Sequence, residues 1–186
     1  MFIVAGAPAH SSFKKTQLLN RLESTSSVQS FESQWVYLFD QALNEQQQQS
    51  AIQLLNDGES FELRQAASDE IQVLVTPRVG TISPWSSKAT DIFANCNTPV
   101  HRLERGVLFT LKGINTVSAE LKLALHDRMT ESVFNQIEDA RALFSETEPK
   151  PLNAIDILGQ GKDALVKANN EFGFALSAEE IDYLTE

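Results

Sequence analysis

The sequence predicts an α+β fold, a two-layer sandwich in which helices pack on one antiparallel sheet. Runs of β-branched and aromatic residues alternate along the chain with segments whose apolar residues recur at helical spacing. The order strand, helix, strand, helix occurs twice, in copies that span about 1–69 and 70–146. Two such units can complete one sheet with helices on a face. We therefore expect an internally duplicated domain with pseudo-twofold symmetry, followed by a mostly helical linker segment.

The first copy contains two predicted strands and two predicted helices. Residues 2–5 (FIVA) form a short strand, and residues 31–39 (FESQWVYLF) form a longer strand bounded by polar residues. Between the strands, Ser11 is a suitable N-cap for a helix that has three leucines on one face. A second helix is expected at about 44–56.

The second copy repeats this order. Residues 71–75 and 103–111 predict its strands, and residues 118–125 predict its second helix. At an offset of 72 residues, Ser11 aligns with Ser83, which is followed by proline as expected at a helix start. The aligned strands share apolar positions and few identities, so accidental resemblance is the alternative to duplication.

The last third of the sequence predicts further helices. Apolar residues recur at helical spacing throughout 126–146, which predicts one long amphipathic helix. Pro149 and Pro151 then end that pattern, and we place the boundary between two domains there, at 1–147 and 148–186.

The second domain is expected to be incomplete at its C-terminus. A capping box from Ser177 to Glu180 predicts a last helix, and apolar residues continue through Leu184 almost to the end of the sequence. We therefore expect the chain to be the front part of a larger protein.

Composition narrows the classes of function. Hydrophobic residues at 42 % and charged residues at 22 % are typical of a soluble globular protein. No apolar run approaches the roughly 18 residues of a membrane span, and no signal peptide is evident. One cysteine fits a reducing cytoplasm. The net charge of −10 argues against nucleic-acid binding, and RNA binding is further disfavoured because the strands lack the aromatic pattern of RNA-binding sheets.

One segment departs from the acidic character of the chain. Residues 77–112 carry a net charge of +3, which leaves −13 for the remainder. The segment includes a helix start rich in hydroxyl groups, where anions can bind, although a helix cap alone accounts for such residues. Gly106 in mid-strand predicts a bulge or a close backbone approach. The candidate coupling or contact residues are Arg78, Ser83, Trp85, Ser86, Ser87, Lys88, Asp91, Arg102 and Arg105.

No catalytic residue is predicted. The sequence has no glycine-rich phosphate loop, no HExxH or CxxC motif and no histidines spaced as metal ligands, so we expect no metal and no cofactor in this chain. Cys96 falls on the apolar stripe of its helix and is expected to be a core residue. Glu32 and Glu104 lie at matching strand starts, where a solvated or paired carboxylate is the usual outcome.

Several segments resemble one enzyme family. They are TPRVGTISPWSSKATDIFANC, VHRLERGVLFTL, ELKLALHDRMTESVF, ILGQGKDAL and FALSAEEIDYL. Together they make the chain similar, along essentially its whole length, to the N-terminal region of the large single-chain phosphoribosylformylglycinamidine synthase. In that family, this region resembles a fused dimer of the small bridging subunit of the multi-subunit enzyme, followed by a linker domain.

The resemblance implies a role in purine biosynthesis. The family's enzyme uses ATP, with Mg²⁺, and glutamine to amidate formylglycinamide ribonucleotide in the cytoplasm. The partners implied for this chain are the synthase and glutaminase domains of the same polypeptide, with no nucleic acid and no membrane. Both active sites lie in those domains, so the chain alone is expected to be inactive.

Two questions stay open at this point. The segment Arg78 to Arg105 could face the ammonia route or the phosphorylated substrate at the junction with the synthase domain, or it could form only interdomain contacts. The other class of function is a free-standing protein-interaction adaptor that resembles the fused bridging subunits. Whether the reading frame continues past Glu186 into synthase motifs would distinguish the adaptor from the enzyme region.

Overall fold

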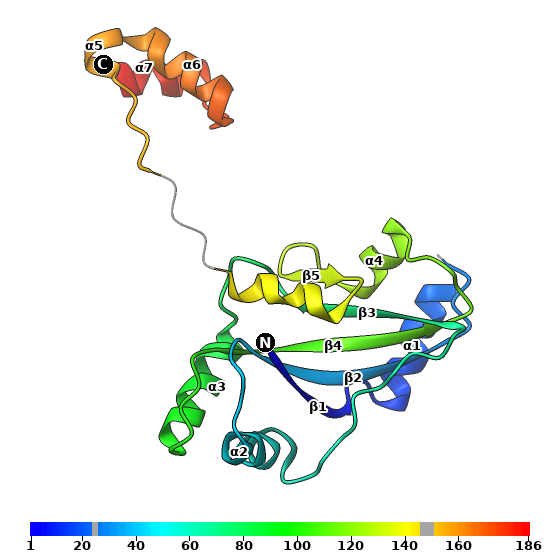
Figure 1. The fold of residues 1–186 in the computed structure, drawn as a ribbon. Coiled ribbons are helices and arrows are strands. Elements are labelled where there is room, and N and C mark those ends of the chain that lie inside the picture. Colours follow the sequence, from blue (N-terminus) through cyan, green and yellow to red (C-terminus); the bar gives the residue numbers. More distant parts are fainter. Residues whose placement is uncertain (24–25, 146–150) are drawn as a thin grey trace. The chain divides into compact units, whose positions relative to one another are not determined.

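The computed structural model describes residues 1–23, 26–145 and 151–186, and the chain forms two compact units, Met1–Thr147 and Glu148–Glu186. The first unit is built on a five-stranded sheet in the order β1-β2-β4-β3-β5, with every neighbouring pair antiparallel (Figure 1). The predicted α+β class with an antiparallel sheet is confirmed. The strands are β1 (Phe2–Pro8), β2 (Ser30–Phe39), β3 (Glu70–Pro77), β4 (Leu103–Lys112) and β5 (Glu131–Phe134).

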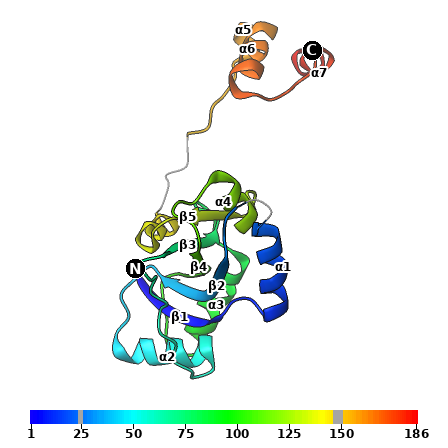
Figure 2. The same cartoon turned by 90° about the vertical axis from the view of Figure 1, so that its right-hand side faces the viewer.

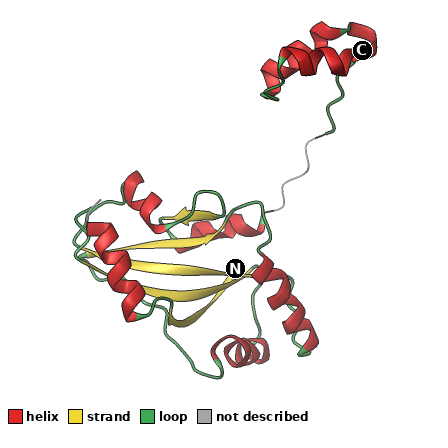
Figure 3. Ribbon diagram, turned by 180° about the vertical axis from the view of Figure 1, so that it is seen from behind, coloured by secondary structure: helices red, strands yellow, loops and turns green. Residues whose placement is uncertain are grey.

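Four helices cover one face of this sheet, where odd-numbered residues of β2 and β4 point. Helices α1 (Ser12–Glu23) and α4 (Ala119–Leu125) pack over one end, on a cluster that includes Phe31 and Phe109. Helices α2 (Glu45–Asn56) and α3 (Pro84–Asn95) pack over the other end. Seen from behind in Figure 3, helices accordingly gather near both ends of the strands. This arrangement leaves the middle of the face, between the two helix pairs, without a described helix packed over it.

The opposite face of the sheet is also apolar and is covered differently. Its buried side chains pack against Ala140 and Leu143 of η1, a 3₁₀ helix at Ile137–Phe144, and against Leu63 from the connection between α2 and β3. Figure 2 shows η1, in yellow, and α1 on opposite sides of the sheet. The sheet residues of this second core are Val36, Leu38, Leu74 and Leu108.

The predicted long helix over 126–146 is wrong. The structure has β5 followed by η1 in this region, and the predicted end at Glu146 lies outside the described residues. β5 pairs with the outer edge of β3, where Val133 lies opposite Val75 and Phe134 opposite Leu74. An unpaired strand edge leaves N–H and C=O groups without partners. The apolar residues of this region could be buried as a helix or as a strand. The strand is favoured because it also supplies hydrogen-bond partners to the edge of β3.

The register of the sheet is compatible with the predicted repeat. Trp35 pairs with Val107, the residue 72 positions later, and Phe31 pairs with Leu111 as Phe39 does with Leu103. A twofold rotation about the Trp35–Val107 pair therefore exchanges β2 and β4. The outer strands match less closely, since Phe2 pairs with Phe39 whereas the partner of Leu111 is Ile71. Descent of both halves from one duplicated unit stays a prediction.

Gly106 makes the close backbone approach that its mid-strand position predicts. A Cβ atom at this residue would lie 2.8 Å from the carbonyl oxygen of Val75 and 3.0 Å from Cδ1 of Leu74. Real Cβ atoms do not approach that closely, so only glycine lets β4 pack here without displacement of β3.

The second unit is mostly helical over its described residues, as predicted. It contains α5 (Ile157–Gln160), α6 (Lys162–Phe172) and α7 (Ala178–Thr185), with Leu165, Ala168 and Ile181 as its buried apolar residues. The predicted capping box begins α7: Ser177 Oγ accepts the Glu180 N–H at 3.2 Å and Glu180 accepts the Ser177 N–H at 2.8 Å. The predicted break at Pro149 lies outside the described residues. Within the described ranges, no helix is long and apolar enough to cross a membrane.

Candidate functional site

The N-terminus of α3 binds a carboxylate of the protein itself, that of Glu104. The side chain of Glu104, on β4, is fully buried, with 0 % of its surface exposed. Its Oε1 accepts the Ser83 N–H at 3.1 Å, and its Oε2 accepts the Ser83 hydroxyl at 2.6 Å. Ser83 is also the N-cap of α3, because its Oγ accepts the Ser86 N–H at 3.0 Å. An internal carboxylate therefore uses both donors of Ser83, the N–H and the hydroxyl.

Arg102 compensates the buried charge of Glu104. Its Nη2 donates to Glu104 Oε1 at 2.8 Å and to the carbonyl oxygen of Thr81 at 2.8 Å, while its Nη1 donates to the carbonyl oxygen of Leu143 at 3.0 Å. The guanidinium carbon lies 5.4 Å from the ring centre of Phe144. Because Leu143 and Phe144 belong to η1, Arg102 ties β4, the loop before α3 and η1 together. We call Ser83, Arg102 and Glu104 the Glu104 network.

Ser86 belongs to the same structural arrangement. Its side chain is buried, and its hydroxyl donates to the carbonyl oxygen of Leu103 at 2.5 Å. Three of the predicted candidates, Ser83, Ser86 and Arg102, thus point inward and hold α3 against β4. Both hydroxyl groups and both terminal nitrogens of Arg102 are hydrogen-bonded within the fold, whereas Nε of Arg102 is buried without a hydrogen-bond partner among the described residues.

Arg105 and Trp85 form a second, more accessible arrangement. The guanidinium carbon of Arg105 lies 4.8 Å from the ring centre of Trp35 and 5.2 Å from that of Trp85, so the cation lies over two indole rings. Tyr37 stacks on Trp85 at 5.9 Å with 23° between the ring planes. No ion pair of Arg105 is seen within the described ranges. We call Trp35, Tyr37, Trp85 and Arg105 the Arg105 stack.

The Arg105 stack lies on the part of the sheet that the helix pairs leave uncovered. A surface hollow of about 310 Å³ is bounded by Trp35, Trp85 and Arg105 on one side and by Pro77 and Glu131 on the other. Trp35, Trp85 and Arg105 are half-exposed. Half-burial of the Tyr37 ring raises the pKa of its hydroxyl, partly opposed by the nearby Arg105 cation. The stack therefore presents flat aromatic surface and one cation at the protein surface.

The remaining predicted candidates are exposed and lie outside both arrangements. Ser87, Lys88 and Asp91 lie on α3, and Arg78 lies in the loop that follows β3. The backbone of Arg78 is held by Thr130, whose carbonyl oxygen accepts the Arg78 N–H at 2.9 Å. The structure thus separates the predicted basic segment into a buried network, a half-exposed stack and an exposed rim.

Two side chains differ from what the sequence indicated. Cys96 is exposed, so its assignment to the core is wrong: α3 ends at Asn95, and Cys96 is the C-cap that closes the helix with an N–H bond to the carbonyl oxygen of Ile92. Glu104 is paired, which is one of the two outcomes expected for a carboxylate at a strand start, but its complete burial at the centre of a network is not predicted by the sequence. The spacing of Arg102 and Glu104, two residues apart and hence on one face of a strand, was the available signal.

Comparison with protein families identifies the chain. The formylglycinamide ribonucleotide amidotransferase N-terminal family matches residues 32–144, which is more than half of the chain. The chain belongs to this family. The resemblance to phosphoribosylformylglycinamidine synthase, the enzyme that amidates formylglycinamide ribonucleotide, is thereby confirmed. The matched residues of this amidotransferase N-terminal domain include the whole Glu104 network and the whole Arg105 stack.

Among the residues that the structure describes, no group of three or more His, Cys, Asp or Glu side chains is arranged to hold a metal ion. What the two arrangements can do is hold α3 and η1 in place and present an aromatic and cationic surface.

Proposed function

We propose that this chain is the scaffold of a formylglycinamide ribonucleotide amidotransferase and couples its synthase domain to its glutaminase domain. In this proposal ATP, Mg²⁺ and glutamine are used by those other domains in the cytoplasm, and the chain itself catalyses no reaction. The family match supports the placement in this enzyme. The internal use of Glu104 and Arg102 supports a structural role for the Glu104 network.

The single observation that carries the proposed docking role is the Arg105 stack. Tryptophan, tyrosine and arginine are the residues that most often dominate the energetics of protein interfaces. Here all three types meet on one half-exposed surface beside a hollow. We propose that this surface contacts the synthase domain and that Arg78, Ser87, Lys88 and Asp91 form the polar rim of the contact.

The geometry favours an interdomain contact over a contact with the phosphorylated substrate. A phosphate at the start of α3 would need the N–H and hydroxyl of Ser83, and Glu104 accepts both. Bringing a second anion beside that buried carboxylate would add like-charge repulsion. Arg105 differs from Arg102 in this respect. It forms no ion pair with a described residue, so a contact with a partner domain would not require an existing ion pair to break.

The test measures coupling in the full-length enzyme. Arg105→Ala and Trp85→Ala are expected to lower glutamine-driven turnover about tenfold, the effect of one interface residue worth roughly 1.4 kcal/mol. Turnover with added ammonia is expected to stay within about twofold, because ammonia needs no transfer between domains. Lys14→Ala is the control, since this exposed lysine on α1 lies outside the proposed contact and should change either rate by less than about twofold.

Two results would count against the proposal. Wild-type turnover with both nitrogen sources in Arg105→Ala and Trp85→Ala would show that the stack has no part in coupling. Equal loss with glutamine and with ammonia would assign the stack to the synthase reaction itself.

A further inference from the structure

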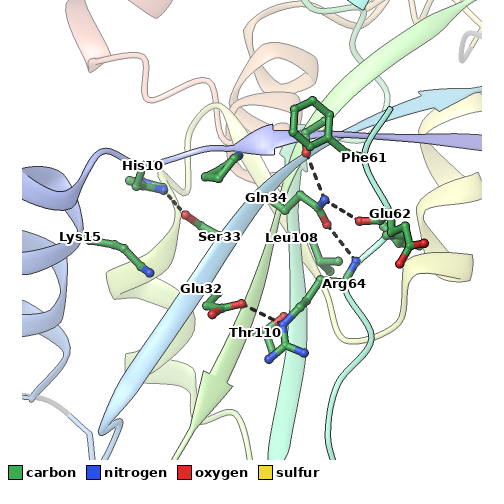
Figure 4. A pocket seen from close by; sticks show the side chains of 13 residues that line it. His10, Lys15, Glu32, Ser33, Gln34, Phe61, Glu62, Arg64, Leu108 and Thr110 are labelled. Carbon is green, nitrogen blue, oxygen red and sulfur yellow. Dashed lines mark hydrogen bonds and ion pairs between the residues drawn. The ribbon is translucent and has the colours of Figure 1, made fainter. Parts of the chain in front are cut away.

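A further cavity of the first unit lies away from both arrangements. It encloses about 510 Å³ and is formed by the start of α1, by β1, β2 and β4, and by the segment 61–64 that crosses them (Figure 4). A volume of this size accommodates a small organic molecule. Apolar groups line part of it, and none of its lining residues was a sequence candidate. The apolar lining residues are Pro8, Phe61, Leu63 and Leu108.

The segment 61–64 is held in place by a glutamine that uses its whole amide. Gln34 Nε2 donates to the carbonyl oxygens of Gly6 at 3.1 Å and Glu62 at 2.8 Å, and Gln34 Oε1 accepts the Arg64 N–H at 3.0 Å. These three bonds fix the segment across β1 and β2. The cavity is therefore a defined feature of the fold and is maintained by specific contacts.

Two cations, Lys15 and Arg64, line the cavity, and they are held differently. Arg64 is bound by two carboxylates, with Nε 2.8 Å from Glu32 and Nη2 3.0 Å from Glu70. Lys15 forms no ion pair with any residue in the described ranges; its Nζ lies 6.0 Å from the ring centre of Phe31. Figure 4 shows Lys15 directed into the cavity, with Glu62 on the far side of Gln34.

A neutral histidine lies beside this cation. His10 Nδ1 is 2.9 Å from Ser33 Oγ, which fixes the orientation of the ring. Burial and the cations of Lys14 and Lys15 lower the pKa of His10, so the ring is uncharged at neutral pH. His10 thus adds a polar group next to Lys15 without adding charge.

The corresponding region in the second half of the unit has a different lining. A hollow of about 390 Å³ there includes Ile82 and Ser87, which lie 72 positions after His10 and Lys15. Glu32 lies opposite Thr110 in the β2–β4 ladder, and Glu104, at the equivalent place in β4, lies opposite Leu38. The side chain of Glu104 is fully buried under Arg102 and η1, whereas 62 % of the Glu32 side chain is exposed. The pairing of a lysine with a histidine in the lining is therefore particular to the first half and does not follow from the fold alone.

We infer that this cavity binds a small organic monocarboxylate whose apolar or aromatic body lies on Leu63 and Leu108. Its carboxylate would pair with Lys15 and accept a hydrogen bond in the region of His10. A single negative charge fits because Lys15 forms no ion pair within the described ranges and can pair with one carboxylate. A second negative charge would meet Glu32.

The test is an NMR titration of the whole chain with 3-phenylpropionate, with 3-phenylpropanol as the uncharged analogue. We expect saturable shifts at residues lining the cavity with Kd of the order of 1 mM, and at least about fivefold weaker binding of the alcohol. Lys15→Ala should remove this preference for the acid. Glu32→Gln should tighten binding of the acid by about twofold or more, since it removes a negative charge and keeps an acceptor for Arg64. Lys14→Ala is the matched control and should change Kd by less than about twofold.

The inference fails if the acid gives no saturable shifts up to about 20 mM, well above the expected Kd. It also fails if the acid and the alcohol bind equally, or if Lys15→Ala keeps the preference for the acid while its spectrum shows an intact fold. Shifts that saturate at residues away from the cavity would place the ligand elsewhere and overturn it as well.

Discussion

Replacing Glu104 with alanine is expected to lower the free energy of unfolding of the first unit by about 3–5 kcal/mol. The substitution leaves the half-buried Arg102 guanidinium without its carboxylate partner and removes the acceptor for both donors of Ser83. A buried charge deprived of its partner costs far more than the pair itself contributes, because the remaining charge stays out of water. The loss should be among the largest of any single polar substitution in this chain.

Urea denaturation of wild-type and variant chains measures this loss, and Glu32→Ala provides the matched control. Glu32 occupies the equivalent strand position and also pairs with an arginine, but its side chain is largely exposed. An exposed pair contributes little, so Glu32→Ala should cost less than about 1 kcal/mol. Equal losses in the two variants would show that burial of Glu104 does not set the strength of the network.

Leu143→Ala is expected to cost about 2–5 kcal/mol of the free energy of unfolding, the usual range for deleting a buried leucine side chain. Leu143 lies in η1, is 1 % exposed and packs on the sheet face formed by Val36, Leu38, Leu74 and Leu108. Its carbonyl oxygen also accepts a bond from Arg102. The side chain therefore anchors the element that the sequence did not predict.

The control for Leu143→Ala is Leu123→Ala on α4. Leu123 is 47 % exposed, so its truncation should change stability by less than about 1 kcal/mol. Comparable small losses in both variants, measured by the same denaturation experiment, would mean that η1 adds little to the core and that the sheet is stable with this face open.

Local patterns sufficed to predict the eight elements of the two copies. Ser83 with the proline after it, and the alternating residues of 31–39, act through contacts within a few residues of the chain. The region 126–146 could not be predicted in this way. Val133 and Phe134 fit a helical stripe as well as a strand, and the outcome depends on the free edge of β3, more than 50 residues earlier in the chain.

The candidate site was predicted as one segment and is divided by the fold. Ser83, Ser86 and Arg102 turn inward because Glu104 lies under the start of α3. The spacing of Arg102 and Glu104 indicates that these two residues can pair, but it does not indicate that they lie next to Ser83. The contact of Arg105 with Trp35 requires that β2 and β4 be neighbours, and the aligned repeat alone does not give that adjacency. The residue types therefore indicated the segment that contains both arrangements. The contacts that each residue makes could be identified only from the tertiary structure.

Hydrogen–deuterium exchange tests the proposed docking of the Arg105 stack most directly. Amide exchange of residues 83–88 and of the residues flanking Arg105 would be compared between the isolated chain and the full-length amidotransferase. We predict slower exchange at these amides in the full-length enzyme, because the synthase domain covers the surface. Identical exchange in the two proteins over these residues would contradict a scaffold that docks through this face.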